Sequence, residues 1–251
     1  MQSKTIEAAS GESQYLSRRT FLKLTSGAAM TGVFGVNLSG SLVYAEALGK
    51  EKRDKMTPDE ILAAFKRGNA NFSKGLRTSR NYINEQKATA KGQYPSAIVL
   101  SCIDSRAPAE VIMDLGIGDI FNARVAGNIS NDDILGSMEF ACKVEGAKVV
   151  LVMGHTSCGA IKGAIDNAEL GNLTGLLAKI KPAMKATTLK GGELSSKNRA
   201  YVDAVALKNV ELTMADIRKK SPVLAELESK GMIKIVGAMY NLETAKLNFF
   251  A

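Results

Sequence analysis

The feature that most constrains the fold of this chain is a repeated alternation of short apolar runs and helix-forming segments. The apolar runs cover residues 96–101, 119–125 and 148–153, and they have the length and β-branched composition of buried strands. Helical patterns over 108–115 and 134–144 separate them. Alternation of this kind predicts a mostly parallel sheet with helices on both faces.

Further elements are predicted on both sides of this series. They are a helical amino-terminal arm with helices beginning at 58 and covering 82–91, helices over 158–165 and 201–219 and from 222 onward, and strands over 232–240 and 245–250. Thr57 and Glu60 form a capping box that starts the first helix. The stretch around Gly191 is predicted to be rich in loops. The predicted fold class is α/β, with four parallel strands, an antiparallel carboxyl-terminal edge strand and flanking helices.

The first 45 residues have the pattern of an export signal. Residues 17–23 read S-R-R-x-F-L-K, the twin-arginine signature, and a mildly apolar stretch follows that is too polar for a stable membrane span. A small-x-small ending places cleavage after Ala45, with Ala47 as a second option. A disordered basic tail or a lipid-seeking helix is the alternative. We expect a signal peptide at 1–45, a linker at 46–56, a single domain at 57–251, and export through the twin-arginine machinery to the periplasm or beyond.

Charge and cysteine usage narrow the function. The net charge is +8, but the lysines are scattered and no basic run is interleaved with aromatic residues, so nucleic acid is not an expected partner. Three cysteines in an exported chain are an odd count, which argues against a simple disulfide framework. The thiols are therefore expected to have another role.

Reactive side chains follow two of the predicted parallel strands directly. The first strand runs into Cys102, Asp104 and Arg106, which share one side if the chain stays extended. The third strand runs into His155, the only histidine, and Cys158, which opens a helix whose amino terminus favours a thiolate. Carboxyl ends of parallel strands meet at one edge of a sheet. Two cysteines and one histidine at this edge would supply three protein ligands. Catalytic zinc sites use that number and keep a fourth position open for water or substrate.

Three other interpretations remain open from the residues alone. Cys142, which we interpret as a core thiol, could join the other three side chains in a closed Cys₃His structural site of a non-enzymatic, zinc-stabilised binding module. Cys102 and Cys158 could instead form a redox pair. Asp104 and Arg106 could be an ordinary surface ion pair, worth about 0–1 kcal/mol.

The motif C-x-D-S-R, followed about fifty residues later by H-x-x-C-G on this background, resembles the β-class carbonic anhydrases. The resemblance runs across nearly the whole chain after the signal. It implies one Zn²⁺ per subunit on Cys102, His155 and Cys158, with Asp104 and Arg106 as the catalytic dyad. The implied reaction is reversible hydration of CO₂ to bicarbonate and a proton by zinc-bound hydroxide. A further hypothesis makes Asp104 a fourth zinc ligand at low pH.

The resemblance also implies a substrate pocket and an assembly. Gln93 stands where plant-like members place a glutamine that usually reaches the substrate across a dimer interface, and we expect a homodimer or a tetramer formed by the pairing of two dimers. The apolar and backbone lining would come from Phe121, Ala126, Gly127 and Phe140.

Two positions depart from the family pattern or specify its subtype. Val125 stands where many members have asparagine, so this part of the pocket rim departs from the family pattern. Val99 replaces the tryptophan that marks the bicarbonate-inhibited subtype, so we expect the plant-like, non-allosteric one. Relatives that hydrolyse carbon disulfide or carbonyl sulfide use the same ligands, and the ligands alone do not separate that activity from CO₂ hydration.

Overall fold

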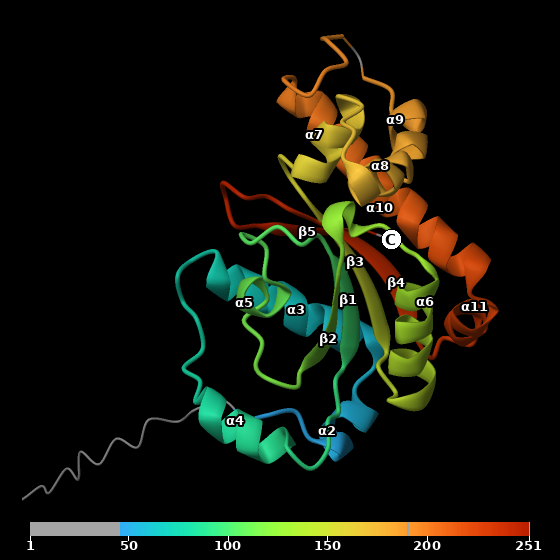
Figure 1. Cartoon of the computed structure of the whole chain (residues 1–251). Helices are drawn as coiled ribbons and strands as arrows, with labels where there is room; N and C mark the ends of the chain where they lie inside the picture. Colours follow the sequence, from blue (N-terminus) through green and yellow to red (C-terminus); the bar gives the residue numbers. More distant parts are fainter. Residues whose placement is uncertain (1–45, 190, 251) are drawn as a thin grey trace, which may run out of the picture. The chain divides into compact units, whose positions relative to one another are not determined.

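The computed structural model describes residues 46–189 and 191–250, so the predicted signal peptide lies outside the described residues. One sheet has the strand order β2–β1–β3–β4–β5, in which β5 alone is antiparallel to its neighbour (Figure 1). The strands are β1 Ala97–Ser101, β2 Ile120–Arg124, β3 Val149–His155, β4 Lys234–Tyr240 and β5 Leu247–Phe250. Every residue of β1 and β3 is buried, as the uninterrupted apolar runs predict. The predicted fold class is confirmed.

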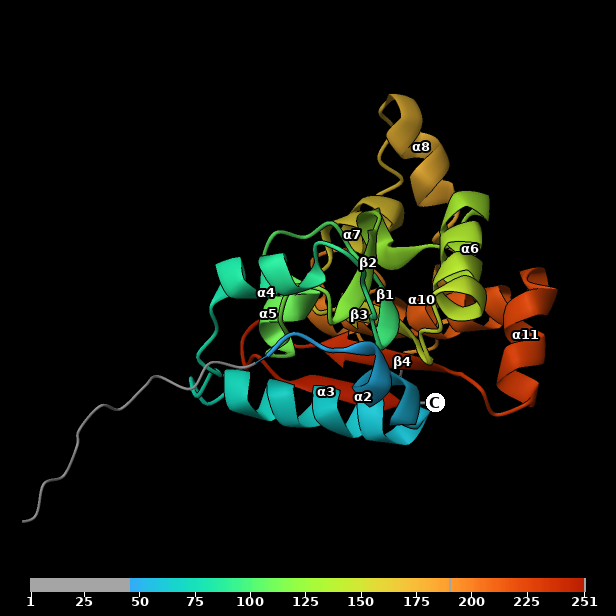
Figure 2. The same cartoon turned by 90° about the horizontal axis from the view of Figure 1, so that it is seen from below.

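Helices cover both faces of this sheet. In chain order they are α2 Lys50–Lys55, α3 Pro58–Phe72, α4 Tyr82–Thr89, α5 Ala109–Ile112, the 3₁₀ turn η1 Ala126–Asn128, α6 Asp132–Glu139, the π-helical turn η2 Phe140–Val144, α7 Gly159–Ile165, α8 Gly171–Ala178, α9 Lys181–Ala186, α10 Arg199–Lys220 and α11 Pro222–Ser229. One core cluster joins the sheet to α3 and α5, and another joins the opposite face to α6, α10 and α11. Figure 2 shows α3 along one of these faces.

Two elements near the site, a strand and a helix, have ends that differ from those predicted. The third strand was predicted to stop at Met153, but β3 continues because Gly154 and His155 pair with Met239 and Tyr240 of β4. His155 is therefore the last residue of a strand, held by a β-ladder. The predicted helix over 134–144 begins at Asp132 instead and ends in the π-helical turn η2.

The segment 46–56, predicted as a plain linker, contains a helix and a buried charge. Arg53 of α2 is 5% exposed, and its guanidinium donates hydrogen bonds to the carbonyls of Pro95 and Glu145. The sequence does not reveal this arrangement, because both acceptors lie in loops far along the chain. The bounds of the linker and of the domain after it stay a prediction.

Two helices, α8 and α9, lie between α7 and the loop around Gly191, where no helix was predicted. Neither has a side-chain hydrogen bond at its N-cap, so the capping signal is absent from both, although Pro182 in the first turn of α9 is typical of a helix start. Among the described helices, none is both long and apolar enough to cross a membrane.

Candidate metal centre

Three potential ligands meet at the carboxyl edge of the sheet. Cys102 directly follows β1, His155 ends the neighbouring β3, and Cys158 is the N-cap of α7. Their ligand atoms all lie within 4.8 Å of one another, and the two Sγ atoms are 4.0 Å apart. All three side chains are buried. The structure thus brings together the ligand set that the strand order predicts.

The protonation of His155 leaves a nitrogen free for a metal. Nδ1 lies 2.9 Å from the carbonyl oxygen of Thr156, a geometry that assigns the ring proton to Nδ1. Nε2 is buried and has no hydrogen-bond partner among the described residues. A buried polar atom of this kind calls for an explanation, and a metal ion provides one.

The spacing of the sulfur atoms also fits zinc. Two thiolates on a tetrahedral Zn²⁺, each at about 2.3 Å, lie about 3.8 Å apart, close to the observed 4.0 Å. A disulfide needs about 2.0 Å, and all three cysteines of the chain are free. The residues present therefore fit a zinc ion.

The two thiols of the site influence each other. Contact with Cys158 lowers the pKa of Cys102, and His155 and the N–H of Gly127 lower it further. The same contact and burial raise the pKa of Cys158, which the backbone N–H groups of α7 only partly offset. The amino terminus of the helix thus acts on Cys158 in the expected direction, but in the two thiols by themselves it does not outweigh the contact with Cys102 and burial. Without a metal, Cys158 therefore keeps its proton when Cys102 is a thiolate. A cation that binds both sulfur atoms must displace the proton of Cys158.

Asp104 and Arg106 form a close pair at the edge of the site. Asp104 Oδ1 accepts hydrogen bonds from the backbone N and Nε of Arg106 at 2.9 and 3.0 Å, and Oδ2 accepts one from Nη2 at 2.7 Å. This pairing lowers the pKa of Asp104 to about 2. An unpaired carboxyl is already ionised at neutral pH, so the main effect of Arg106 there is orientation.

The chain does not stay extended after Cys102, because a turn forms at residues 105 and 106. Asp104 therefore reaches the ligands, with Oδ2 3.7 Å from His155 Nε2, whereas the side chain of Arg106 is 58% exposed. Asp104 is only 13% exposed, which is not typical of a surface ion pair. Its role as a fourth ligand stays a prediction.

Comparison with known proteins identifies the family. The family model described as Carbonic anhydrase matches residues 97–247, which is more than half of the chain and includes all three ligands. The chain belongs to the carbonic anhydrase family. Similar curated proteins include Carbonic anhydrase 2 of Mycobacterium tuberculosis (strain ATCC 25618 / H37Rv), 32% identical over 184 residues, or 73% of this chain and 88% of the relative. The carbonic anhydrase of Mycolicibacterium smegmatis is 32% identical over 187 residues, with 73% and 89% covered.

Solved structures show that the fold is that of β-carbonic anhydrases. A tetrameric β-carbonic anhydrase from Sordaria macrospora has a TM-score of 0.58 and 21% identity, covering 77% of this chain and 98% of its own. The Coccomyxa β-carbonic anhydrase in complex with acetazolamide also has a TM-score of 0.58, at 23% identity, covering 64% and 74%. At these identities the likeness concerns the fold alone.

The pocket residues predicted from this family lie in three places. Ala126 and Gly127 form η1, where the N–H of Gly127 donates to Cys102 Sγ at 3.3 Å. Phe121 of β2 and Phe140 of η2 pack edge to face, with ring centroids 6.3 Å apart. Gln93 is exposed and precedes β1, so it lies at the opposite end of that strand from the ligands. Within one chain Gln93 is therefore remote from the site.

Cys142 does not belong to the carbonic anhydrase site. It lies in η2 within the core cluster that packs against α6 and α11, and burial raises its pKa to about 12. The preceding residue, Ala141, accepts a hydrogen bond from Ala147, which lies just before β3, so this thiol is near the amino end of the strand that His155 ends. The alternative of a closed Cys₃His site is therefore wrong.

Sequence reasoning missed residues that hold the ligand loops. The guanidinium of Arg124 donates to the carbonyls of Cys102 and Asp104 at 2.9 and 2.6 Å. Ser157, whose φ is 54°, donates its backbone N–H to Asp203 Oδ1 at 2.7 Å. The position of Arg124 at the end of β2, beside the end of β1, could have suggested its role, but nothing in the sequence points to Asp203.

Proposed function

We propose that this member of the carbonic anhydrase family catalyses the reversible hydration of CO₂ to bicarbonate and a proton, with one Zn²⁺ per subunit. The observation that carries the proposal is the buried His155 Nε2, which lacks a hydrogen-bond partner in the described part of the chain, beside two thiols whose sulfur atoms lie 4.0 Å apart. The curated relatives named carbonic anhydrase support the activity. When bound, Zn²⁺ supplies Lewis acidity that lowers the pKa of a water molecule to about 7 and so makes hydroxide available at neutral pH.

The chain's own residues hold the metal and orient the reaction. Two thiolates and a neutral imidazole leave a fourth position open and cancel the formal charge of the ion. Asp104, whose Oδ2 lies 3.7 Å from His155 Nε2, accepts a hydrogen bond from the reacting water and directs its oxygen toward the carbon of CO₂. Arg106 holds this carboxylate through both of its oxygens.

The test compares two substrates on one preparation. Zinc-loaded full-length protein is assayed for CO₂ hydration by stopped flow and for release of H₂S from carbon disulfide. We expect one zinc per chain and a kcat/KM for CO₂ of at least about 10⁴ M⁻¹s⁻¹, within the usual range of enzymes. Hydrolysis of carbon disulfide without CO₂ hydration would replace the proposal with the hydrolase activity. Neither activity in the zinc-loaded protein would contradict both.

We also propose that two chains, or two pairs of chains, form the active assembly. Support comes from Gln93, which is exposed and remote from the ligands of its own chain, so only a second copy can bring it to a site. The related structure from Sordaria macrospora is described as tetrameric. Sedimentation of the zinc-loaded protein should give the mass of two or four chains.

Export to the periplasm or beyond is the remaining proposal, supported by the motif at residues 17–23. Replacing Arg18 and Arg19 together by lysine should retain the protein in the cytoplasm at its uncleaved length, because the twin-arginine pair is what the export machinery reads. Cell fractionation with immunoblotting makes the measurement, and replacement of Lys4 and Lys50, which lie outside the motif, by arginine is the control. Normal export of the Arg18→Lys, Arg19→Lys protein would contradict the proposal.

A further inference from the structure

A backbone turn beside the ligands connects the site to the long helix α10. Gly127 of η1 donates its N–H to Cys102 Sγ at 3.3 Å, and its carbonyl oxygen accepts a hydrogen bond from Asn209 Nδ2 at 2.7 Å. The N–H belongs to the peptide plane before the Gly127 Cα, and the carbonyl belongs to the plane after it. The orientation of each plane therefore depends on the φ and ψ angles of one glycine.

That glycine has a backbone conformation that the surrounding contacts must maintain. Gly127 has φ 71° and ψ 16°, in the left-handed region, and an added Cβ would lie 2.7 Å from Cδ1 of Ile180. The left-handed backbone favours glycine here, and glycine is also the residue with the greatest backbone freedom. Two hydrogen bonds hold the peptide after Gly127: its N–H, on Asn128, donates to the carbonyl of Val125 at 2.9 Å within the turn, and its carbonyl accepts from outside the turn.

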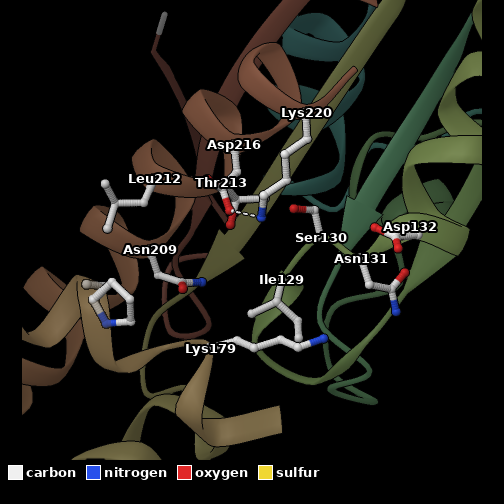
Figure 3. Close-up of a pocket in the computed structure, with 12 residues that line it drawn as sticks. Ile129, Ser130, Asn131, Asp132, Lys179, Asn209, Leu212, Thr213, Asp216 and Lys220 are labelled. Atoms are coloured by element: carbon white, nitrogen blue, oxygen red, sulfur yellow. Dashed lines mark hydrogen bonds and ion pairs between the residues drawn. The ribbon is translucent and has the colours of Figure 1, made fainter. Parts of the chain in front are cut away.

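Asn209 provides such a contact from a rigid element. It lies inside the 22-residue helix α10 and is 3% exposed. Figure 3 shows it on that helix, in the wall of a cavity of about 480 Å³, with Ile129 and Lys179 opposite. A buried amide that donates at 2.7 Å to a backbone carbonyl restricts the peptide that carries this carbonyl.

We propose that Asn209 is a positioning residue of the metal centre, which keeps the Gly127 N–H directed at Cys102 Sγ by holding the next peptide. The inference rests on the proposed function, because it takes Cys102 as a metal ligand. The N–H holds the Cys102 sulfur in the place from which it binds the metal, and it also withdraws charge from a metal-bound thiolate. Groups that orient and polarise ligands in this way commonly change metal affinity about 10- to 100-fold.

The experiment uses the full-length protein with Asn209→Leu, which keeps the side-chain size and removes the donor. Thr213→Val is the matched control, because Thr213 lies one turn further along α10, lines the same cavity and is also buried. We expect the zinc dissociation constant of Asn209→Leu, measured by competition with a chelator, to rise at least about 10-fold. The thiolate-to-cobalt absorption band of its Co²⁺ form should move to longer wavelength. Thr213→Val should match the parent in both.

An Asn209→Leu protein that folds and keeps the parent's zinc affinity and cobalt band would overturn the inference. If the variant does not fold, the unaltered protein loaded with ¹¹³Cd gives an independent test. Scalar coupling between cadmium and the amide proton of Gly127 is expected, and its absence overturns the inference as well. A parent that binds metal but does not hydrate CO₂ would instead contradict the proposed function and leave this assignment standing.

Discussion

Replacing Cys158 by serine will remove zinc from the protein and lower CO₂ hydration at least about 10³-fold. Cys158 is 1% exposed, so water cannot readily take its place as a ligand. A serine hydroxyl stays protonated at neutral pH, and zinc prefers thiolate and imidazole in such a site. Metal content per chain, measured on dialysed protein, and stopped-flow hydration rates check the two parts of this prediction.

Cys142→Ser is the control, because it makes the same chemical change in the hydrophobic core. It should retain one zinc per chain and full activity. It should lower the free energy of unfolding by about 1–3 kcal/mol, since a hydroxyl replaces a buried thiol. If Cys158→Ser kept its zinc and its activity while folded, the ligand assignment would be wrong. Loss of zinc from folded Cys142→Ser would restore the closed Cys₃His site.

Asp104→Asn should keep zinc and still lose about 10²- to 10⁴-fold in CO₂ hydration, the usual contribution of a positioned acid or base. The amide has the shape of the carboxylate but carries no charge. It also cannot accept the hydrogen bonds of Arg106 on both of its side-chain atoms. The pair would lose its fixed geometry, and the reacting water would lose its acceptor. Zinc content and kcat/KM, measured on the same preparation, separate metal loss from misorientation.

Asp216→Asn supplies the matched comparison. Asp216 is also paired with a cation, Lys220, at 2.7 Å, but this pair is about half exposed on α10. Its removal should change activity by less than about twofold and the free energy of unfolding by at most about 1 kcal/mol. Equal activity losses in Asp104→Asn and Asp216→Asn would show that any lost ion pair has the same effect, and Asp104 would have no catalytic role.

The sequence predicts the ligand cluster because it depends on topology. Once β1 and β3 are identified as parallel neighbours, the side chains that follow them must meet at one edge, however the loops are folded. Cys102 and His155 are therefore predictable to within a few ångström. The same reasoning places Cys142 away from the site, since the helical segment that bears it runs back toward the amino ends of the strands.

The contacts that orient this cluster are not predictable in the same way. Asn209 bonds to Gly127 across 82 positions of the chain, and Asp203 bonds to Ser157 across 46. Carboxylate and amide side chains are common on helix surfaces, so neither residue stands out in the sequence. Asn209 and Asp203 reach the site because α10 packs against the ends of the strands. Gln93 is the opposite case. Its position in the family pattern is clear from the sequence, but the fold of a single chain places it at the end of β1 that is far from the ligands.

The separation of Cys142 from the other two thiols has a practical consequence. Alkylating reagents attack thiolates, and with a pKa of about 12 only about one Cys142 in 10⁴ is a thiolate at pH 8 even if the reagent can reach it. Cys102, whose pKa is lowered, is the more readily alkylated of the two once the metal has departed and the reagent can reach this buried side chain. Pulsed labelling followed by mass spectrometry therefore records two events in one sample. A label on Cys102 marks a chain that has lost its ion, and a label on Cys142 marks a chain whose core has opened.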